Sequence, residues 1–227
     1  MPVGTQQPVP FEGAPGVRGF LHRPENPAGD VIVLSHGAGS DANAPLLVNM
    51  ARIFAGAGFT VLRLNLPYRQ ARPKGPPLPG SAARDREGLR LAVQDARTLA
   101  SEDGRIFLGG HSYGGRQSTM LAAENPGLAN GLLLLSYPLH PPNRPDQLRA
   151  SHFPALHTPA LFVHGSRDPF GSLAEMTEAL QLIVAPTRLV AIDGAAHELA
   201  HGRTVKGTAK SVPEVVLDCF REFFPAR

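Results

Sequence analysis

The chain has 227 residues, and it contains a single cysteine and no long apolar run. One cysteine excludes an internal disulfide, and the place of Cys219 in an expected C-terminal apolar helix favours a buried thiol. A membrane helix needs roughly 20 consecutive apolar residues. Residues 1–8 carry neither a basic region nor an apolar stretch, so they do not resemble a signal peptide. We therefore expect a cytoplasmic protein with no membrane partner.

Charge is also modest. The sequence has 22 Lys and Arg residues against 19 Asp and Glu, which gives a net charge of +3. The basic residues are spread out, except around Arg69, Arg72 and Lys74 and at the pair Arg84 and Arg86. Nucleic-acid surfaces carry a denser basic stripe, and metal sites need paired His, Cys or Asp ligands that this sequence does not show. We expect no nucleic-acid partner, no metal and no cofactor, while the oligomeric state stays open.

Apolar runs rich in β-branched residues alternate with helical patterns along the whole chain. Strands are expected at residues 17–22, 31–35, 59–64, 105–108, 131–136, 160–164 and 188–192. Helices are expected at residues 46–57, 82–100, 115–123, 173–184 and 212–224. This order predicts an α/β fold, with a mostly parallel central sheet of about seven to eight strands and helices on both faces. We expect a single domain over residues 1–227, with residues 1–16 as an irregular N-terminal arm.

The most specific motif is Gly110-His111-Ser112-Tyr113-Gly114, which follows an expected strand and precedes an expected helix. A G-x-S-x-G turn in this setting is a nucleophile elbow, which presents a serine hydroxyl above the end of a parallel sheet. The glycines let strand and helix approach each other closely. Ser112 is therefore the candidate nucleophile, and the alternative is a serine that caps a helix.

Small residues follow the first parallel strand, in the segment Ser35-His36-Gly37-Ala38-Gly39. Such a segment can direct a backbone N–H at a developing negative oxygen. We assign the oxyanion-hole donors to the backbone N–H groups of Ala38 and Tyr113. A glycine-rich turn without a chemical role is the alternative.

The acid and the base of a triad are expected after later strands. Asp168 follows the strand at 160–164, where a carboxylate can orient a histidine. Its rival, Asp193, lies only four positions before His197, and a strand-end aspartate can also simply cap a helix. His197 follows the last strand, so the chain order is Ser, Asp, His, as in the α/β fold that carries this elbow. His201 is its competitor, and a surface histidine without a role is the other alternative. His111 is discounted because neighbours in a sharp turn point in different directions.

Two loops are expected to form the substrate pocket: Asn65–Ser81, rich in Pro and Arg, and the Pro-rich segment Tyr137–Thr158. At about 20 residues, the second loop is too short for a separate lid domain, so we expect an open crevice. Arg69 could bind a carboxylate or phosphate on the substrate, and an exposed arginine without that role is the alternative. The candidate lining residues are Tyr68, Arg69, Tyr137, Leu139 and Phe170.

The chain resembles the α/β-hydrolases. It is most similar to the Tex-type hydrolase-like proteins, which include testis-expressed protein 30 and a subunit of the non-specific-lethal histone acetyltransferase complex, and it also resembles dienelactone-hydrolase-like enzymes. The stretches that carry the resemblance span most of residues 31–200. They are Leu34–Gly39, Arg63–Arg69, Gly109–Gly115, Leu135–Pro142 and Phe162–Gly171.

The resemblance implies the α/β-hydrolase fold without a large lid domain. Together with the candidate triad, it favours a serine hydrolase that cleaves a small carboxylic ester through an acyl-enzyme. Thioesters, amides or peptides are alternative substrates, since the fold does not choose the leaving group. The remaining alternative is a non-catalytic interaction module.

Overall fold

The computed structural model describes residues 7–199, 204–205 and 207–226. Its centre is an eight-stranded sheet in the order β1-β2-β4-β3-β5-β6-β7-β8. The two pairs that involve β2 are antiparallel, and all other neighbours are parallel, which confirms the expected mostly parallel sheet. The strands are β1 (Val9–Glu12), β2 (Arg18–His22), β3 (Val31–Ser35), β4 (Thr60–Asn65), β5 (Ile106–His111), β6 (Gly131–Leu135), β7 (Ala160–Gly165) and β8 (Thr187–Ile192).

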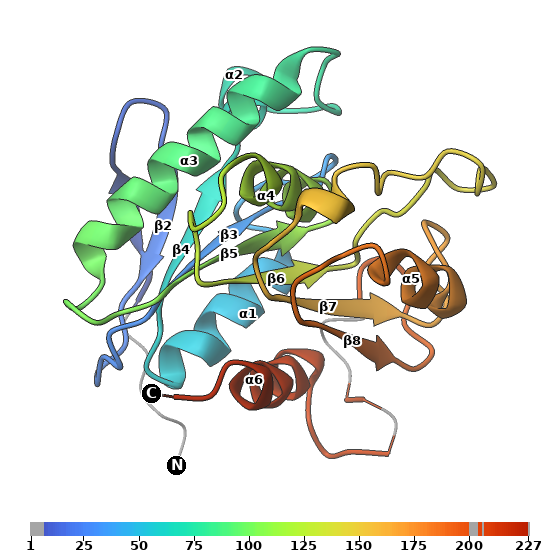
Figure 1. Ribbon diagram of the computed structural model, residues 1–227. Helices are drawn as coiled ribbons and strands as arrows, with labels where there is room; N and C mark the ends of the chain where they lie inside the picture. Colours follow the sequence, from blue (N-terminus) through green and yellow to red (C-terminus); the bar gives the residue numbers. More distant parts are fainter. Residues whose placement is uncertain (1–6, 200–203, 206, 227) are drawn as a thin grey trace.

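Helices cover both faces of the sheet (Figure 1). One hydrophobic cluster lies between the sheet and α3, α4 and α5, and a second lies between the sheet and α1 and α6. Among the helices that the structure describes, none has the length and apolar character needed to cross a bilayer. The helices are α1 (Pro45–Gly56), α2 (Pro67–Ala71), α3 (Ser81–Leu99), α4 (Tyr113–Glu124), α5 (Leu173–Leu180) and α6 (Val212–Phe223), with a short 3₁₀ turn at Phe153–Ala155.

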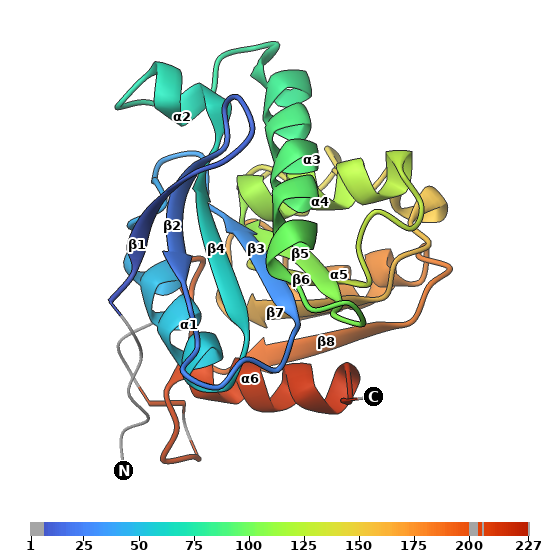
Figure 2. The same cartoon turned by 90° about the vertical axis from the view of Figure 1, so that its left-hand side faces the viewer.

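The N-terminal arm is not irregular throughout, which corrects the expectation for residues 1–16. Residues Val9–Glu12 form β1, which pairs with β2 at the edge of the sheet (Figure 2). Pro10 obscured this strand in the sequence, because proline cannot donate to a strand ladder. An edge strand tolerates proline where the missing N–H would face solvent.

The two expected pocket loops also contain short elements that the sequence did not reveal. The five-residue helix α2 lies within Asn65–Ser81, with Pro67 at its start, where the missing proline N–H costs nothing. A five-residue helix is too short to show a periodic apolar pattern. The second loop holds the 3₁₀ turn, and the described part of the chain contains no large lid domain.

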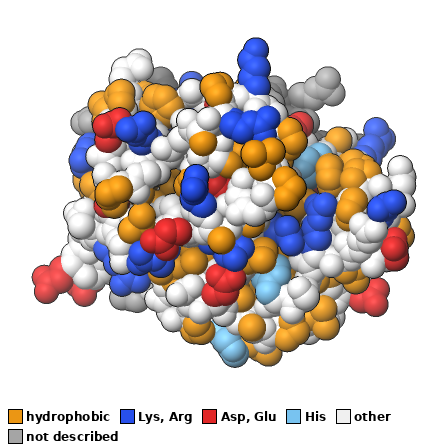
Figure 3. Space-filling view, turned by 90° about the horizontal axis from the view of Figure 1, so that it is seen from above, with side chains coloured by type: hydrophobic (Ala, Val, Ile, Leu, Met, Phe, Trp, Pro, Cys, Tyr) orange, Lys and Arg blue, Asp and Glu red, His pale blue; other side chains and the backbone are white. Residues whose placement is uncertain are grey.

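The parallel strands β3, β5, β6, β7 and β8 end at one edge of the sheet, and the connections that follow them therefore meet there. On the helical face above α3 and α4, side chains of both charges are spread between apolar ones (Figure 3). The candidate site is built at the edge where the strands end.

Candidate active site

The loops after β5, β7 and β8 bring three side chains together at this edge. The Oγ of Ser112 lies 2.8 Å from Nε2 of His197. The other ring nitrogen, Nδ1, lies 3.0 and 2.9 Å from the two carboxylate oxygens of Asp168. Since a carboxylate can only accept here, Nδ1 carries the proton, and Nε2 is left to accept from the serine hydroxyl. The residues chosen from the sequence thus form one continuous hydrogen-bonded chain.

Ser112 lies in a tight turn whose strained backbone is held in place by close packing against neighbouring segments. Its backbone has φ 51° and ψ −114°, a conformation that L-residues rarely adopt. The turn is tight because the flanking glycines leave room. A Cβ on Gly110 would lie 2.3 Å from the Ser35 carbonyl oxygen, and one on Gly114 would lie 2.5 Å from Ser35 Oγ. The glycines at both sides of the serine are therefore sterically required.

Asp168 is buried, and its carboxyl group is held in the charged form. Burial raises its pKa, but hydrogen bonds from His197 and from the Phe170 backbone N–H outweigh this, so the pKa lies below its usual value. Beneath it, the fully buried His164 donates from Nε2 to the Gly171 carbonyl at 2.7 Å. Burial lowers the pKa of His164, so this ring is a neutral support of the loop that carries Asp168.

The segment after β3 lies beside the elbow, where the Gly114 N–H donates to the carbonyl of His36 at 3.1 Å. His36 Nε2 accepts from the Leu66 N–H at 3.1 Å, so its Nδ1 carries the proton and donates to the Gly37 carbonyl at 2.8 Å. Burial lowers the pKa of His36 to about 4, which keeps this ring neutral. Among the described residues, neither the N–H of Ala38 nor that of Tyr113 donates to a protein acceptor. Both N–H groups therefore stay the candidate oxyanion-hole donors.

Arg69 does not face an open pocket, which corrects the expectation that it binds substrate. Its side chain is buried, and it donates to the backbone carbonyls of Ser40, Arg72, Ala38 and Gly75 at 2.8 to 3.1 Å. The hydroxyl of Tyr68 donates to the Gly37 and Ala38 carbonyls at 3.0 and 2.9 Å. Both side chains therefore brace the segment that carries the Ala38 N–H.

Two other expected lining residues lie in the core. Tyr137 is 1% exposed and packs against Phe153 and Phe162, while Leu139 is fully buried. Aromatic and leucine side chains in a Pro-rich loop look alike in sequence whether they face a crevice or the core. Phe170, the remaining expected lining residue, does lie beside the candidate triad, with its ring centroid 4.2 Å from that of His197.

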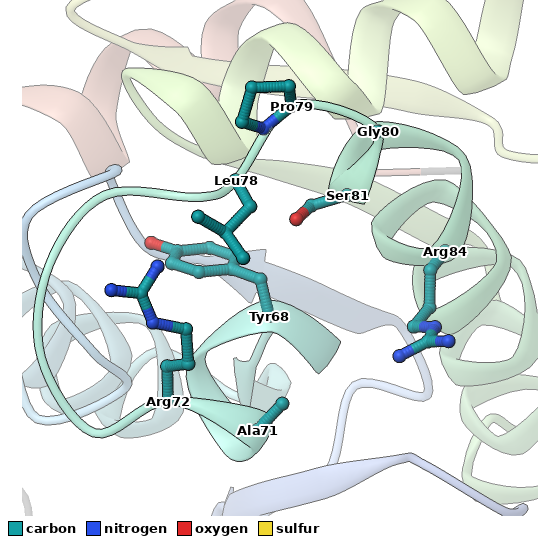
Figure 4. Close-up of a pocket in the computed structure, with 8 residues that line it drawn as sticks. All are labelled: Tyr68, Ala71, Arg72, Leu78, Pro79, Gly80, Ser81 and Arg84. Atoms are coloured by element: carbon teal, nitrogen blue, oxygen red, sulfur yellow. The ribbon is translucent and has the colours of Figure 1, made fainter.

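A cavity of about 270 Å³ opens on the far side of Tyr68, between α2, the start of α3 and the loop that joins them. Figure 4 shows Leu78 over the Tyr68 ring, with Arg72 and Arg84 on different sides of the cavity and Ser81 at its rim. Tyr68, which lines this cavity, meets Tyr113 of the elbow edge to face, with ring centroids 5.7 Å apart.

Sequence reasoning missed Asp85, which is fully buried on α3. It accepts hydrogen bonds from the Tyr113 hydroxyl at 2.7 Å and the Tyr68 N–H at 2.9 Å, while burial raises its pKa. The helix periodicity held the signal, since Asp85 lies four residues before Leu89 on the apolar face. It joins α3 to the two tyrosines next to the elbow.

The other candidates for the acid and the base of the triad make different contacts or lie outside the described residues. Asp193 accepts a hydrogen bond from the Ser166 hydroxyl at 3.4 Å, while His197 Nδ1 bonds to Asp168. His201 lies outside the described residues. His111 does not serve Ser112, but it donates from Nε2 to the backbone carbonyl of His197 at 2.9 Å, a contact that the sequence did not suggest.

The fold and this arrangement define a member of the α/β-hydrolase class. The model of the alpha/beta hydrolase domain family matches residues 28–224, and the chain belongs to that family.

Solved structures share the fold at low sequence identity. A dienelactone hydrolase from Anabaena variabilis is 22% identical, with a TM-score of 0.72 over 96% of this chain and 98% of that one. Ferulic-acid-bound Est1E from Butyrivibrio proteoclasticus is 17% identical, with a TM-score of 0.73 over 95% and 97%. A lidless serine hydrolase from Xanthomonas campestris is 18% identical, with a TM-score of 0.67 over 100% and 98%.

Proposed function

We propose that this protein is a serine hydrolase that cleaves a small carboxylic ester through an acyl-enzyme. The observation that carries the proposal is the hydrogen-bonded chain from Ser112 through His197 to Asp168, with distances of 2.8 to 3.0 Å. Serine is a weak nucleophile, and it needs an adjacent base that a carboxylate orients. The esterase and serine-hydrolase neighbours of the same fold agree with this class of reaction.

In the proposed reaction, His197 Nε2 takes the hydroxyl proton as Ser112 Oγ attacks the ester carbonyl. The N–H groups of Ala38 and Tyr113 stabilise the negative oxygen of the tetrahedral intermediate. His197 then gives the proton to the leaving alcohol, and the acyl group remains on Ser112. Water activated by the same histidine releases the acid, and Asp168 stabilises the charged imidazolium in both steps.

The decisive experiment is labelling with a fluorophosphonate probe, combined with hydrolysis of p-nitrophenyl butyrate. We expect the wild type to react in both assays and Ser112→Ala to react in neither, while its melting temperature is retained. Because triad members act as a unit, adding His197→Ala to Ser112→Ala should cost little more. Equal hydrolysis by wild type and Ser112→Ala would overturn the assignment.

Two alternatives keep the same fold. Thioesterase, amidase or peptidase activity would use the same residues, and a thioester and amide panel separates these from an esterase. A non-catalytic interaction module would resemble the Tex-type relatives proposed from the sequence, one of which is a complex subunit. Absence of fluorophosphonate labelling would favour a non-catalytic interaction module. It would also favour placing the chain among the Tex-type proteins.

A further inference from the structure

A second group of polar side chains lies beside the triad, on α4 and the Pro-rich loop that follows β6. Arg116 is one helical turn beyond the nucleophile, and its backbone N–H donates to the Ser112 carbonyl at 2.9 Å. Its Nε is buried and has no hydrogen-bond partner, and the same holds for Nε2 of the fully buried Gln117. Buried donors without an acceptor are rare and costly, so this pair needs an explanation.

Two further arginines, Arg149 and Arg86, lie near these donors. The hydroxyl of Tyr137 donates to the backbone carbonyl of Arg149 at 2.6 Å, and Arg149, on the loop, is close enough to Arg116 for the two charges to interact. Burial and the nearby Arg116 lower the pKa of Arg149. Arg86 is also close, but it pairs with Glu124 at 3.1 Å and with Gln117.

No carboxylate of the described chain pairs with either of the other two guanidinium groups. The described ion pairs include neither Arg116 nor Arg149. Figure 3 views this helical face, where Lys, Arg and His side chains lie near the middle with Asp and Glu side chains beside them. The guanidinium groups of Arg116 and Arg149 are half-buried, repel each other and have no anionic partner among the described residues. Such a pair is suited to bind an anion.

The group is connected to the triad on both sides. The Arg149 N–H donates to the Leu139 carbonyl at 2.7 Å, and the next residue, His140, donates to the Phe170 carbonyl at 3.0 Å. The Phe170 ring in turn contacts the ring of His197, with centroids 4.2 Å apart and the planes tilted by 35°. One end of the group thus connects to the nucleophile turn through the backbone of α4, and the other connects to the loop of the base through the backbone of the Pro-rich loop.

We propose that the guanidinium groups of Arg116 and Arg149 form a subsite for an oxyanion, a carboxylate or a phosphate, carried by the substrate. The inference rests on the proposed hydrolase function, and it narrows the substrate class to acidic esters. A planar guanidinium matches the two oxygens of a carboxylate or phosphate, and hydrogen bonds of this kind are stronger than neutral ones.

The test compares mono-p-nitrophenyl succinate with p-nitrophenyl butyrate, which have the same acyl length and differ in charge. We expect the wild type to favour the succinate ester in kcat/KM. Arg149→Met should reduce the succinate-to-butyrate ratio roughly tenfold to a hundredfold, the loss of one charge-assisted hydrogen bond. Arg116→Met should act in the same direction, and Arg149→Lys should retain part of the preference.

The position of the anion is read from a second substrate pair, p-acetoxybenzoate and its neutral methyl ester. A preference that depends on Arg149 in the first pair places the anion on the acyl side, and one in the second pair places it on the alcohol side. Either result supports the subsite. If Arg149→Met leaves both ratios unchanged, the inference is wrong.

Arg144→Met is the matched control, because Arg144 is an exposed arginine on the same loop, and it should leave both ratios unchanged. Arg149→Glu separates charge recognition from packing. This variant should prefer a cationic substrate, the p-nitrophenyl ester of trimethylammoniobutyrate, over the succinate ester. If Arg149 had only a structural role, the substitution would instead lower kcat/KM for all esters by the same factor.

Failure of the hydrolase proposal is distinguishable from failure of the subsite. If the wild type hydrolyses no ester and is not labelled by the fluorophosphonate, the hydrolase proposal fails. Anion binding is then measured by the rise in melting temperature with succinate or inorganic phosphate. A rise in the wild type and in Arg144→Met, but not in Arg149→Met, supports the subsite, and equal behaviour of the three proteins overturns it.

Discussion

His111 donates a hydrogen bond from Nε2 to the backbone carbonyl of His197 at 2.9 Å, and the two imidazole rings lie 5.1 Å apart. Burial lowers the pKa of His111, so its ring is neutral and has one N–H to give. The residue immediately before the elbow serine thus fixes the loop that supplies the proposed base. Three residues of a single motif, His111, Ser112 and Tyr113, would then act on three parts of one site.

We expect His111→Phe, which keeps a ring but removes the donor, to reduce kcat for p-nitrophenyl butyrate by about fivefold while KM changes little. The loss of one hydrogen bond is worth about 1 kcal/mol, and here it acts on the position of His197. His111→Gln, which retains a donor, should recover part of the rate. An unchanged kcat with a raised KM would contradict this positioning role.

Arg69→Met should reduce kcat by loosening the segment that carries the Ala38 N–H. Arg69 joins this segment to the chain at Arg72 and Gly75, so the loop beyond α2 should also be cleaved faster by trypsin or chymotrypsin. Steady-state kinetics and limited proteolysis measure the two effects. Lys74→Arg, an exposed change in the same loop that keeps its trypsin site, serves as the control and should alter neither.

Stability should fall as the pH is lowered from about 6.5 to about 4.5. His22 and His36 are buried, and burial lowers the pKa of each from 6.5 to about 4. In this window the unfolded chain takes up protons that the folded chain does not, so each histidine reduces the free energy of unfolding by at most about 1.4 kcal/mol per pH unit. Urea unfolding over a pH series measures the slope.

His22→Gln tests this assignment, because His22 Nε2 accepts a hydrogen bond from Arg63 Nε at 2.8 Å, and a glutamine oxygen can also accept. The variant should have a flatter dependence of stability on pH than the wild type in the same window. His157→Gln, at an exposed histidine, should leave the slope unchanged. Equal slopes for the wild type and His22→Gln would show that His22 does not contribute.

Substrate size should be limited. The described chain has no lid domain to cover a long acyl chain, and Tyr137 and Leu139 are already committed to the core. A buried CH₂ contributes about 0.8 kcal/mol only where the protein covers it. For p-nitrophenyl esters, kcat/KM should rise over the first few carbons and then level off or fall. A profile that keeps rising to long chains would show a deeper crevice.

The parts of the fold with strong periodicity were predictable from the sequence. The expected strand at 31–35 matches β3, and the expected helix at 82–100 differs from α3 by one residue at each end. Residues after parallel strands were also informative, because the topology brings the ends of β5, β7 and β8 together. Ser112, Asp168 and His197 could be grouped before their distances were known.

The roles of individual polar residues could not be predicted, because they depend on where each side chain points in the folded structure. Arg69 and Asp85 are both charged and both buried, and only tertiary contacts decide that one braces carbonyls while the other joins two tyrosines. The role of His111 depends on a backbone carbonyl 86 residues away in the chain. Sequence spacing alone does not carry such information.

Because the backbone at Ser112 has a positive φ of 51°, the stability of a variant at this position depends on whether the new residue tolerates that conformation. Glycine adopts such a conformation without strain, so Ser112→Gly should unfold at a higher temperature than Ser112→Ala, although both lack the hydroxyl. Selection for stability alone would therefore favour loss of the proposed nucleophile without loss of the fold. In a lineage that does not need the proposed hydrolysis, we expect this serine to be among the first residues to drift, and a glycine in its place to mark a relative retained as a scaffold.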